Sequence, residues 1–306
     1  MAALPAKNTW LIVNPHAGKG KGRRCFAALQ PELVKKFPGL AVRFSDYPGH
    51  SVRIGEEARL QGVERILTIG GDGTPFEVIN GVYAAGRPTR AIEFGMIPAG
   101  TGNSFIRDFS PPSPARALDN IMAGRLQKID LIEFSYRRGG QECRQYFLNI
   151  LGVGLIADIL KLTNEKLKVL GPLGYSVAVL ARLARKMRNV VSLAFDGEKL
   201  IVHRSALVVS NSKFTGGKMK IAPQADAQDG RADLVVFNDV NRREILQIFG
   251  RVFSGTHTRH PKVLCRRVRE LAIDADPPQL LMADGELLGE TPARLKVLPG
   301  ELTVLL

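Results

Sequence analysis

The sequence predicts two folds in succession: an amino-terminal α/β domain with a doubly wound parallel sheet, and a larger, mostly antiparallel, β-sandwich-like second domain. Three observations lead to this prediction. Strand-like and helix-like segments alternate over roughly the first 130 residues, as they do in βαβ units. Three of these strand-like segments end in glycine-rich loops. From about Lys128 the alternation gives way to short apolar segments bounded by turn residues, which is typical of antiparallel sheets.

The first domain repeats a strand, a loop and a helix. Its strand-like segments are TWLIVNP (9–15), LAVRFSD (40–46), ERILTIGGDG (64–73) and AIEFGMIPAGTGN (91–103), the last of which runs from strand into loop. Its helix-like segments are CFAALQPELVKKF (25–37), SVRIGEEARLQG (51–62), TPFEVINGVYAA (74–85) and SPARALDNIMAG (113–124). In such a sheet ligands bind outside the carboxyl ends of the strands. The glycine-rich loops NPHAGKGKG (14–22), GGDGTPFE (70–77) and PAGTGN (98–103) all follow strand ends.

The second domain is built from short strands with a few helices among them. The strand-like segments are KIDLIEFSY (128–136), CRQYFLNILGVG (143–154), VVSLAFDGEKL (190–200), SALVVSNS (205–212), ADLVVFND (232–239), RELAIDAD (269–276), QLLMADGELLG (279–289) and ARLKVLPG (293–300). Apolar helices are expected at about 157–170 and 175–187, and another helix at about 242–253.

Composition limits the class of protein without choosing a function. The 306 residues contain no apolar run of eighteen or more and no secretory signal, and the net charge is +14. An excess of this kind suits nucleic acid, an anionic membrane surface or a polyanionic substrate. The basic clusters at 18–24, 182–188 and 266–269 are scattered, and aromatic residues make up only 7%, so we expect no nucleic-acid partner. Three distant cysteines favour reduced thiols and a cytoplasmic location.

The glycine-rich loops are candidates for phosphate binding, because they offer bare backbone N–H groups with helices behind them. The first loop is no Walker A motif: Gly20, rather than Ser or Thr, follows Lys19. No GxGxxG fingerprint follows the first strand either. One such loop alone is more often a tight turn. Three at the same predicted sheet edge, with Thr74, Thr101 and Asn103 as side-chain donors, favour a ligand site.

In these loops the chain resembles the diacylglycerol kinase-type lipid kinases, which include bacterial YegS-like lipid kinases and sphingoid-base kinases. GGDGTPFEVINGV (70–82) resembles their GGDGT nucleotide loop, and NPHAGKGKG and PAGTGNSF (98–105) are similar to their first and third loops. Further matches are SDYPGH (45–50), KIDL (128–131), GPLGY (171–175), DAQDGRADLVV (226–236) and ADGE (283–286). GGDGT alone is shared with NAD kinases and phosphofructokinases, so the pairing with the late ADGE carries the resemblance.

The resemblance implies an ATP-binding domain at 1–127, a β-rich lipid-substrate domain at 128–291, and an active site in the cleft between them. The chain end, about 292–306, is expected to pack back on the first domain. The implied nucleotide-binding residues are Asn14, Pro15, His16, Ala17, Gly18, Lys19, Ser45, His50, Gly70, Gly71, Asp72, Gly73, Thr74, Glu77, Gly100, Thr101 and Asn103. For Glu77 the alternative is a capping-box glutamate that serves Thr74.

Phosphoryl transfer needs positioned phosphates, magnesium and a base for the acceptor proton. By analogy with the family, Asp284 is expected to be that base, with Glu286 orienting or sharing the proton. The alternative for a DG pair is a hairpin tip, and FDGE (195–198) is read as one. The resemblance implies magnesium at Asp72, with Asp130 joining an acidic network. It also implies a structural magnesium near Asp226, Asp229 and Arg231, for which a solvated hairpin is the alternative.

The predicted function is an ATP- and Mg²⁺-dependent lipid kinase that phosphorylates a primary hydroxyl of a lipid such as diacylglycerol or a sphingoid base. Its lipid partner is expected at a membrane surface that the enzyme visits without spanning it; the oligomeric state is open, with a homodimer as one alternative. One departure is Ser104, where bacterial diacylglycerol kinases have Asp. Two other functions stay open: an NAD-kinase-like enzyme with a soluble acceptor, and a non-catalytic nucleotide- or lipid-binding homologue.

Overall fold

The computed structural model describes residues 7–162, 189–203 and 205–306. The chain divides into two compact units. Unit 1 is made of Met1–Leu131 and Pro299–Leu306, and unit 2 is Ile132–Leu298. The division expected from the sequence lay at 127/128, with about 292–306 returning to the first domain. In the structure the returning segment is the shorter Pro299–Leu306.

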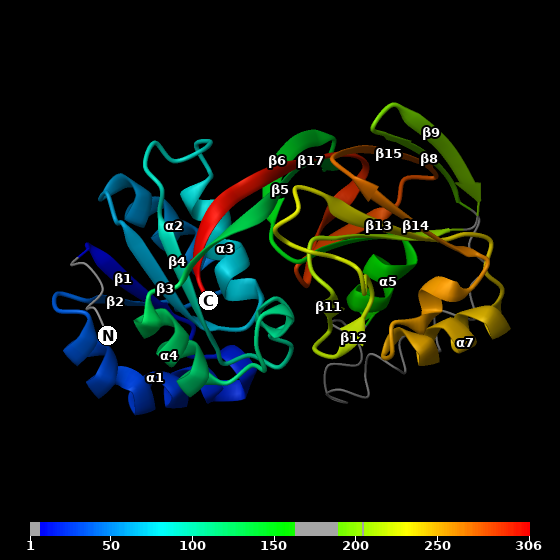
Figure 1. The fold of residues 1–306 in the computed structure, drawn as a ribbon. Helices are drawn as coiled ribbons and strands as arrows, with labels where there is room; N and C mark the ends of the chain where they lie inside the picture. Colours follow the sequence, from blue (N-terminus) through cyan, green and yellow to red (C-terminus); the bar gives the residue numbers. More distant parts are fainter. Residues whose placement is uncertain (1–6, 163–188, 204) are drawn as a thin grey trace. The chain divides into compact units, whose positions relative to one another are not determined.

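Unit 1 is a parallel sheet with helices on both faces (Figure 1). Its elements are β1 (Thr9–Val13), α1 (Ala17–Lys36), β2 (Ala41–Phe44), α2 (His50–Leu60), β3 (Arg65–Gly70), α3 (Gly73–Val82), β4 (Glu93–Pro98), the 3₁₀ turn η1 (Ile106–Asp108) and α4 (Pro114–Ala123). The strands lie in the order β4, β3, β1, β2. The end of β17 (Glu286–Leu305) adds a further parallel strand beside β4. This is the doubly wound arrangement that the alternation predicts.

The core of unit 1 explains why these segments form strands. All five residues of β1 and all six of β3 and of β4 are buried, as expected for strands covered on both faces. On one face, side chains of β1, β3 and β4 pack against Leu33 of α1 and against Leu118 and Ile121 of α4. Helices α2 and α3 cover the opposite face (Figure 1). The rigid sheet therefore fixes where each following loop begins.

Helix α1 begins earlier than the sequence predicts, at Ala17 rather than near Cys25. Gly18, Lys19 and Gly20 have left-handed backbone angles, with φ of 57°, 59° and 86°. These three residues interrupt the helix, so that its regular part begins beyond them. The expected loop is thus present as a left-handed interruption within the first turns of α1.

Unit 2 is antiparallel throughout its described strand pairs. Its strands are β6 (Gln141–Phe147), β7 (Ile150–Val153), β8 (Val190–Phe195), β9 (Glu198–His203), β10 (Ala206–Ser210), β11 (Phe214–Thr215), β12 (Met219–Lys220), β13 (Ala232–Phe237), β14 (Val263–Val268), β15 (Glu270–Asp276), β16 (Leu280–Ala283) and most of β5 (Leu126–Arg138) and β17. One path runs β14, β13, β10, β7, β16, β17, and β17 also pairs with β15, which continues to β8 and β9.

In the described part of unit 2 the helical elements are α5 (Leu155–Leu162), α7 (Arg242–Val252) and the 3₁₀ turn η4 (Thr256–Arg259). Helix α7 begins at a capping box, in which Asn241 and Glu244 exchange side-chain and backbone hydrogen bonds. Its Ile248 and Val252 join a core with Val208 and Val235 of the sheet. The helix predicted at 175–187, most of that at 157–170, the GPLGY segment and the basic cluster at 182–188 lie outside the described residues.

None of the helices in the described part of the chain is long and apolar enough to cross a membrane.

Candidate active site

The three glycine-rich loops of unit 1 leave the sheet at one edge. In the register of the parallel strands, Val13 lies opposite Ile69, and Gly70 lies opposite Pro98. The loops therefore begin at the same level on three adjacent strands. Backbone hydrogen bonds continue past the strand ends, since Asn14 N donates to Ile69 O at 2.9 Å and Ala99 N donates to Gly70 O at 2.7 Å. The three loops thus lie at one edge of the sheet, where the sequence predicts them.

The loops touch one another where they are glycine. A Cβ built on Gly100 would lie 2.4 Å from the Cα of Gly71, and one on Gly18 would lie 2.4 Å from the carbonyl oxygen of Ala99. Real Cβ atoms do not approach backbone so closely. The second loop therefore meets the third at Gly71 and Gly100, and the first meets the third at Gly18 and Ala99. Bare backbone is needed at these positions because the loops pack directly on each other.

The first loop is shaped by Asn14. Its Oδ1 accepts the backbone N–H groups of His16 at 3.0 Å and of Ala17 at 3.1 Å. A side chain on Gly22 would lie 1.9 Å from the carbonyl oxygen of Asn14. Asn14 therefore holds the loop, whereas His16 and Lys19 are exposed at it. Lys19 is placed where its charge can meet an anion without first being desolvated.

Asp72 joins the second loop to the third. Its Oδ1 accepts the backbone N–H of Ser104 at 2.7 Å and that of Phe105 at 3.4 Å. Burial raises the pKa of the Asp72 carboxyl, and hydrogen bonds from Ser104, Phe105 and Asn103 oppose that rise. Asn103 closes the third loop on itself: its Oδ1 accepts from Gly100 N and its Nδ2 donates to Gly100 O, each at 3.0 Å.

Thr74 lies over the start of the second loop. Its side chain packs against the backbone of Gly70, and a Cβ added to Gly70 would lie 2.1 Å from the Thr74 Oγ1 atom. The hydroxyl is buried and has no hydrogen-bond partner among the described residues. An unsatisfied buried hydroxyl costs free energy, and such costs are kept chiefly at functional sites. Bare backbone, left-handed residues and one unsatisfied hydroxyl together fit a phosphate group at this edge.

Glu77 does not cap Thr74 in this structure. Its Oε1 accepts the backbone N–H of Gly49 at 3.1 Å, so it links α3 to the start of α2. The N-cap residue of α3, Asp72, makes no side-chain cap hydrogen bond. Ser45 is buried, and its N–H donates to Val13 O at 2.9 Å. It therefore lies at the same sheet edge as the loops.

His50 is occupied by local contacts at the start of α2. Its Nδ1 accepts the backbone N–H of Asp46 at 3.0 Å and lies 3.5 Å from that residue's carboxylate. Its ring stacks on Tyr47 with centroids 4.6 Å apart. A nucleotide-binding role for His50 stays a prediction. Thr101 is exposed at the tip of the third loop.

In unit 2 the ADGE segment forms a tight β-hairpin. Ala283 of β16 pairs with Glu286 of β17, and the two turn residues have positive φ, 46° at Asp284 and 95° at Gly285. This is the turn for which an Asp-Gly pair is the usual sequence. The turn points the Asp284 side chain back toward β7. Glu286 is exposed at the first position of β17.

Asp284 is buried, with only 6% of the residue exposed. Its Oδ2 accepts the backbone N–H of Leu148 at 2.9 Å, and its Oδ1 accepts those of Asn149 at 3.0 Å and Ile150 at 2.8 Å. Three successive amides at the start of β7 thus converge on one side chain. Asp284 is held in place by these bonds and in turn holds the chain that enters β7.

Sequence reasoning missed a buried polar cluster beside these amides. Asn149, Asn211 and Ser212 are all at most 4% exposed. The Ser212 hydroxyl hydrogen-bonds to Asn149 Oδ1, and Asn211 Nδ2 donates to Leu148 O at 2.9 Å. The available signal was the polar triplet SNS (210–212) at the end of the buried strand β10, since polar side chains there need buried partners. The cluster fixes the segment that Asp284 binds.

The remaining predicted metal residues lie in local networks. Asp130 is 1% exposed, and its Oδ1 accepts the N–H of Gly300 at 2.7 Å within unit 1. In unit 2, Asp229 pairs with Arg267 and Asp226 accepts the N–H of Gln228 at 3.1 Å. Arg231 lies 3.9 Å from Asp196. Among the described residues no three His, Cys, Asp or Glu side chains are grouped so as to hold a metal.

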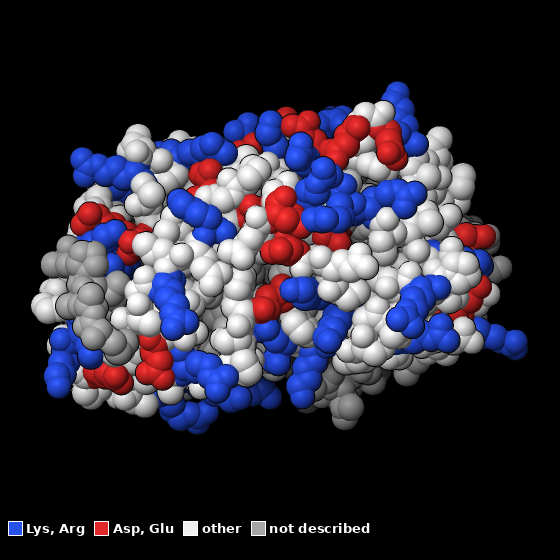
Figure 2. All heavy atoms as spheres, in the orientation of Figure 1, with Lys and Arg blue, Asp and Glu red and all other residues white. Residues whose placement is uncertain are grey.

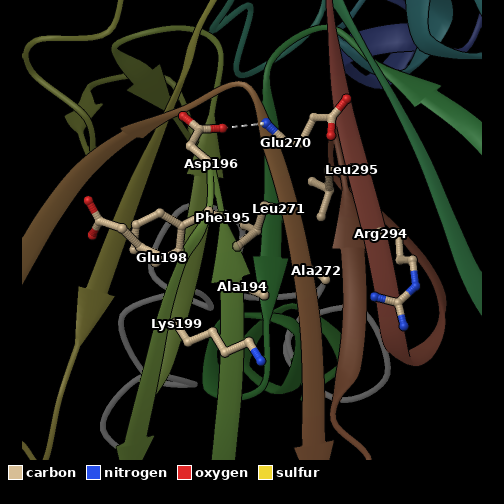
Figure 3. A pocket seen from close by; sticks show the side chains of 11 residues that line it. Ala194, Phe195, Asp196, Glu198, Lys199, Glu270, Leu271, Ala272, Arg294 and Leu295 are labelled. Carbon is tan, nitrogen blue, oxygen red and sulfur yellow. Dashed lines mark hydrogen bonds between the residues drawn. The ribbon is translucent and has the colours of Figure 1, made fainter.

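A separate hollow of about 320 Å³ lies on the sheet of unit 2 and contains none of the predicted site residues. Figure 3 shows Lys199 and Arg294 on either side of Ala194 and Ala272, which come from adjacent strands. The FDGE turn, Phe195 to Glu198, forms another part of its wall. This turn is a hairpin like ADGE, with φ of 46° at Asp196 and 87° at Gly197.

A parallel α/β unit with three glycine-rich loops at one sheet edge, followed by an antiparallel unit with a hairpin carboxylate pair, is the arrangement expected of a phosphotransferase. Comparison with known proteins gives the family. Residues 8–134 match the diacylglycerol kinase catalytic domain, and residues 149–306 match the YegS C-terminal NAD kinase beta sandwich-like domain. The chain belongs to the diacylglycerol kinase-type, YegS-like lipid kinase family, and the predicted family, fold class and enzyme class are confirmed.

Individual relatives agree along nearly the whole chain. The chain is 28% identical over 293 residues to the diacylglycerol kinase of Staphylococcus carnosus (strain TM300), covering 94% of this chain and 91% of the relative. It is 28% identical over 303 residues to that of Bacillus subtilis (strain 168), covering 96% and 92%. Its fold is similar to the crystal structure of a diacylglycerol kinase from Bacillus anthracis strain Sterne, with a TM-score of 0.74, 23% identity and coverage of 99% and 97%.

Proposed function

We propose that this lipid kinase transfers the γ-phosphate of ATP, in the presence of Mg²⁺, to a primary hydroxyl of a lipid such as diacylglycerol or a sphingoid base. One observation carries the proposal: three glycine-rich loops meet in direct backbone contact at one sheet edge of unit 1, at Gly71 with Gly100 and at Gly18 with Ala99. Such a surface of bare amides suits a chain of phosphates better than any other common ligand.

In this proposal unit 1 holds the nucleotide. Asn14 and Asn103 fix the first and third loops by hydrogen bonds from their side chains to backbone groups of the loops. Lys19, exposed at the first loop, pairs with phosphate oxygens. The Thr74 hydroxyl, which has no partner among the described residues, supplies a donor close to them. These groups position the phosphates, and positioning is most of what catalysis of phosphoryl transfer requires.

Asp72 is the carboxylate that the second loop offers to magnesium. A magnesium ion bound mainly by phosphate oxygens and water needs only one or two protein carboxylates. The ion would neutralise charge that develops on the transferred group. The proposal keeps a second, structural magnesium near Asp226, Asp229 and Arg231 as a prediction. There the Arg267 guanidinium already pairs with Asp229.

Unit 2 supplies the acceptor side in this proposal. Asp284 and Glu286 on the ADGE hairpin are the carboxylates assigned to the acceptor hydroxyl, because proton removal needs a base beside it. A lipid acceptor places the reaction at a membrane surface. We propose a cytoplasmic enzyme that binds that surface peripherally, drawn by its net charge of +14. On the face drawn in Figure 2, basic side chains are spread out with acidic ones among them.

The soluble-acceptor alternative has one observation in its favour. The family model that matches residues 149–306 is described as NAD kinase beta sandwich-like. A test of function therefore needs NAD beside the lipids. The non-catalytic alternative rested on Ser104. In the structure Ser104 contributes its backbone N–H to Asp72, a donor that any residue other than proline would supply.

The experiment is transfer of labelled γ-phosphate from ATP to diacylglycerol, a sphingoid base, phosphatidylglycerol, ceramide and NAD, with and without EDTA. Asp72→Asn is the matched control, because it keeps an oxygen acceptor for Ser104 and removes the charge. We expect one labelled lipid, loss of label with EDTA and at least a tenfold reduction in the variant. Label on NAD alone would favour the soluble acceptor, and no label on any acceptor would contradict the proposal.

A further inference from the structure

We propose that the hollow on the sheet of unit 2 binds the phosphate group of a phosphomonoester between Lys199 and Arg294. The hollow has a volume of about 320 Å³, and none of its lining residues belongs to the glycine-rich loops or to the ADGE hairpin. The site is therefore distinct from the proposed kinase site, and its ligand does not have to be ATP or the lipid acceptor.

A single row of side chains across four strands forms the floor and two walls of the hollow. Lys199 of β9 pairs with Ala194 of β8. Ala272 of β15 pairs with Ala194 on one side and with Arg294 of β17 on the other. Side chains directly opposite each other share a face of the sheet, so two alanines lie between two cations, as Figure 3 shows. Three strand spacings of about 4.8 Å separate the cationic residues by roughly 14 Å, and the alanines leave that space open.

The floor of the hollow is held rigidly from the other face of the same strands. Phe195, Leu271 and Leu295 are at most 6% exposed. They are neighbours in the sequence of the two alanines and of Arg294, and successive side chains of a strand point to opposite faces. Core packing therefore fixes the strands that carry the cations. A site built on strands keeps its geometry better than one built on a loop.

The charge of both cations is available to a ligand. Lys199 is exposed and has no ion pair among the described residues. Arg294 Nη2 lies 4.0 Å from Asp274 Oδ2, and the two side chains are 64% and 55% exposed. An exposed pair at such a distance contributes little free energy, so the guanidinium can turn to a ligand at little cost.

The carboxylates around the hollow are occupied or directed elsewhere. Glu270 Oε1 lies 3.1 Å from Lys296 Nζ, and Asp196 accepts the backbone N–H of Glu270 at 3.2 Å. Glu198 pairs with the buried Phe195, so its side chain leaves the sheet on the face opposite to the two cations. These carboxylates therefore do not cancel the charge that the cations present over the alanines.

A phosphomonoester is the class of ligand that matches this arrangement. It carries a charge of about −1.5 to −2 near pH 7, which balances two cations, whereas a carboxylate or a phosphodiester carries a single charge. The guanidinium of Arg294 can bind two phosphate oxygens at once, and the ammonium of Lys199 acts as a point charge. The phosphate can come from a free phosphomonoester or from a lipid headgroup. The product of the proposed kinase reaction belongs to the same chemical class.

The test is titration calorimetry of the full chain with glycerol 3-phosphate, in the absence of ATP. A second arm measures retention on phosphatidylcholine vesicles that contain phosphatidic acid, a phosphomonoester, or phosphatidylglycerol, a phosphodiester. We expect at least one phosphomonoester probe to bind, and the Lys199→Gln/Arg294→Gln double variant to weaken that binding at least tenfold. Lys35→Gln/Lys36→Gln is the matched control, because it removes the same charge from exposed positions in the last turn of α1. It should change binding less than twofold.

Two further variants assign the binding to the hollow rather than to the loops of unit 1. Ala194→Phe fills the hollow and keeps both cations. It should abolish binding at an unchanged Tm, since an aromatic side chain suits an exposed strand position. In protein labelled at the alanine methyl groups, the NMR signals of Ala194 and Ala272 should shift with the probe. The same shifts should persist in Lys19→Gln, which alters the first glycine-rich loop.

The two arms distinguish the sources of the phosphate. Binding of glycerol 3-phosphate through the hollow would identify a free phosphomonoester as sufficient. Retention on phosphatidic acid vesicles alone, lost in the double variant, would identify a lipid headgroup.

Two results would overturn the proposal: alanine methyl signals that shift with neither probe, or binding that Lys19→Gln removes and the double variant keeps. Equal retention on phosphatidic acid and phosphatidylglycerol vesicles, without binding of glycerol 3-phosphate, would overturn it as well. A protein that binds a phosphomonoester here but phosphorylates no acceptor would contradict only the proposed function. An active kinase without binding in the hollow would contradict only this site.

Discussion

The Oδ1 atom of Asp72 accepts the backbone N–H of Ser104 at 2.7 Å. This bond joins the second glycine-rich loop to the third, and the N–H of Phe105 reinforces it at 3.4 Å. Because the donor is a backbone group, Ser at position 104 does not weaken the connection. The departure that the sequence raised at this position therefore leaves the loop geometry intact.

Asp72→Asn separates the charge of this residue from its structural role. The asparagine Oδ1 can still accept from Ser104, so we expect Tm to change by no more than about 2 °C, within roughly 0.5 kcal/mol. ATP-dependent stabilisation of the fold in the presence of Mg²⁺ should be largely lost. Asp72→Ala removes both functions and should cost about 1–2 kcal/mol of unfolding free energy as well. Thermal denaturation with and without ATP measures both the Tm of each variant and the rise in Tm that ATP causes. An equal rise in Tm with ATP in wild type and in Asp72→Asn would refute the role of the charge.

Gly100→Ala tests the contact between the loops. The added Cβ would lie 2.4 Å from the Cα of Gly71, so the second and third loops must separate. We expect ATP binding, measured by calorimetry, to weaken by at least tenfold, about 1.4 kcal/mol, together with a lower Tm.

Gly250→Ala is the matched control for that variant. Gly250 lies within α7, and a Cβ there meets nothing within 4 Å. Alanine should stabilise the helix by about 0.5–1 kcal/mol without changing ATP affinity. If Gly100→Ala left ATP affinity unchanged, close packing of the loops would not be what the nucleotide requires.

Glu77→Ala tests the link between α3 and α2. The variant leaves the N–H of Gly49 without the acceptor that Glu77 Oε1 provides at 3.1 Å. We expect a loss of about 1 kcal/mol in unfolding free energy, with ATP affinity changed less than threefold. Urea denaturation and calorimetry give the two values. A large loss of affinity with unchanged stability would instead support the nucleotide-binding role of Glu77.

We expect the Asp233→Asn substitution to stabilise the fold by an amount that depends on pH. Asp233 lies on β13 and is 6% exposed. Burial raises the pKa of its carboxyl to about 6; the charge of Arg267 lowers the pKa, and the charges of Asp229 and Asp226 raise it. Because the folded pKa lies above the ordinary value of 3.8, the wild-type protein loses stability as pH rises from about 4 to about 6, and the loss is complete above that range. The Asn variant avoids this cost.

We expect Asp233→Asn to be more stable than wild type by about 1–2 kcal/mol near pH 8. The difference should shrink as pH falls toward about 3, below the ordinary value, where the wild-type carboxyl is protonated in both states. Denaturation at the two pH values is the measurement. A stability difference independent of pH would show that Asp233 does not titrate in this range.

Several local features followed from the sequence because they depend on short-range rules. The alternation through residue 124 predicted the parallel sheet, since apolar strands between amphipathic helices bury both faces only in that way. The DG pairs at 196–197 and 284–285 are hairpin turns, as their left-handed preference requires. The start of α1 was less predictable, because Gly18 to Gly20 interrupt a helix that begins at Ala17.

The roles of the site residues were harder to predict from the sequence, because they depend on partners that are distant in the sequence. The spacing of Glu77 and Thr74 suits a capping box. In the structure the Glu77 carboxylate instead accepts the backbone N–H of Gly49, which is 28 residues away in the sequence. The amides that enclose Asp284 lie 134 to 136 residues from it. The buried cluster of Asn149, Asn211 and Ser212 gave no motif, since its members meet only when β7 and β10 pair.

The sequence by itself determined the class of this protein: the order of strands and helices, the loops that end the strands, and the late ADGE hairpin. Each depends on backbone preference and burial within a few residues. Only the tertiary structure decided which groups these segments present to a ligand. Asp284 and Glu286 are two positions apart in the same turn, and burial against β7 encloses one while the edge of β17 exposes the other. That difference arises because a side chain's accessibility and hydrogen bonds are set by the strands packed around it.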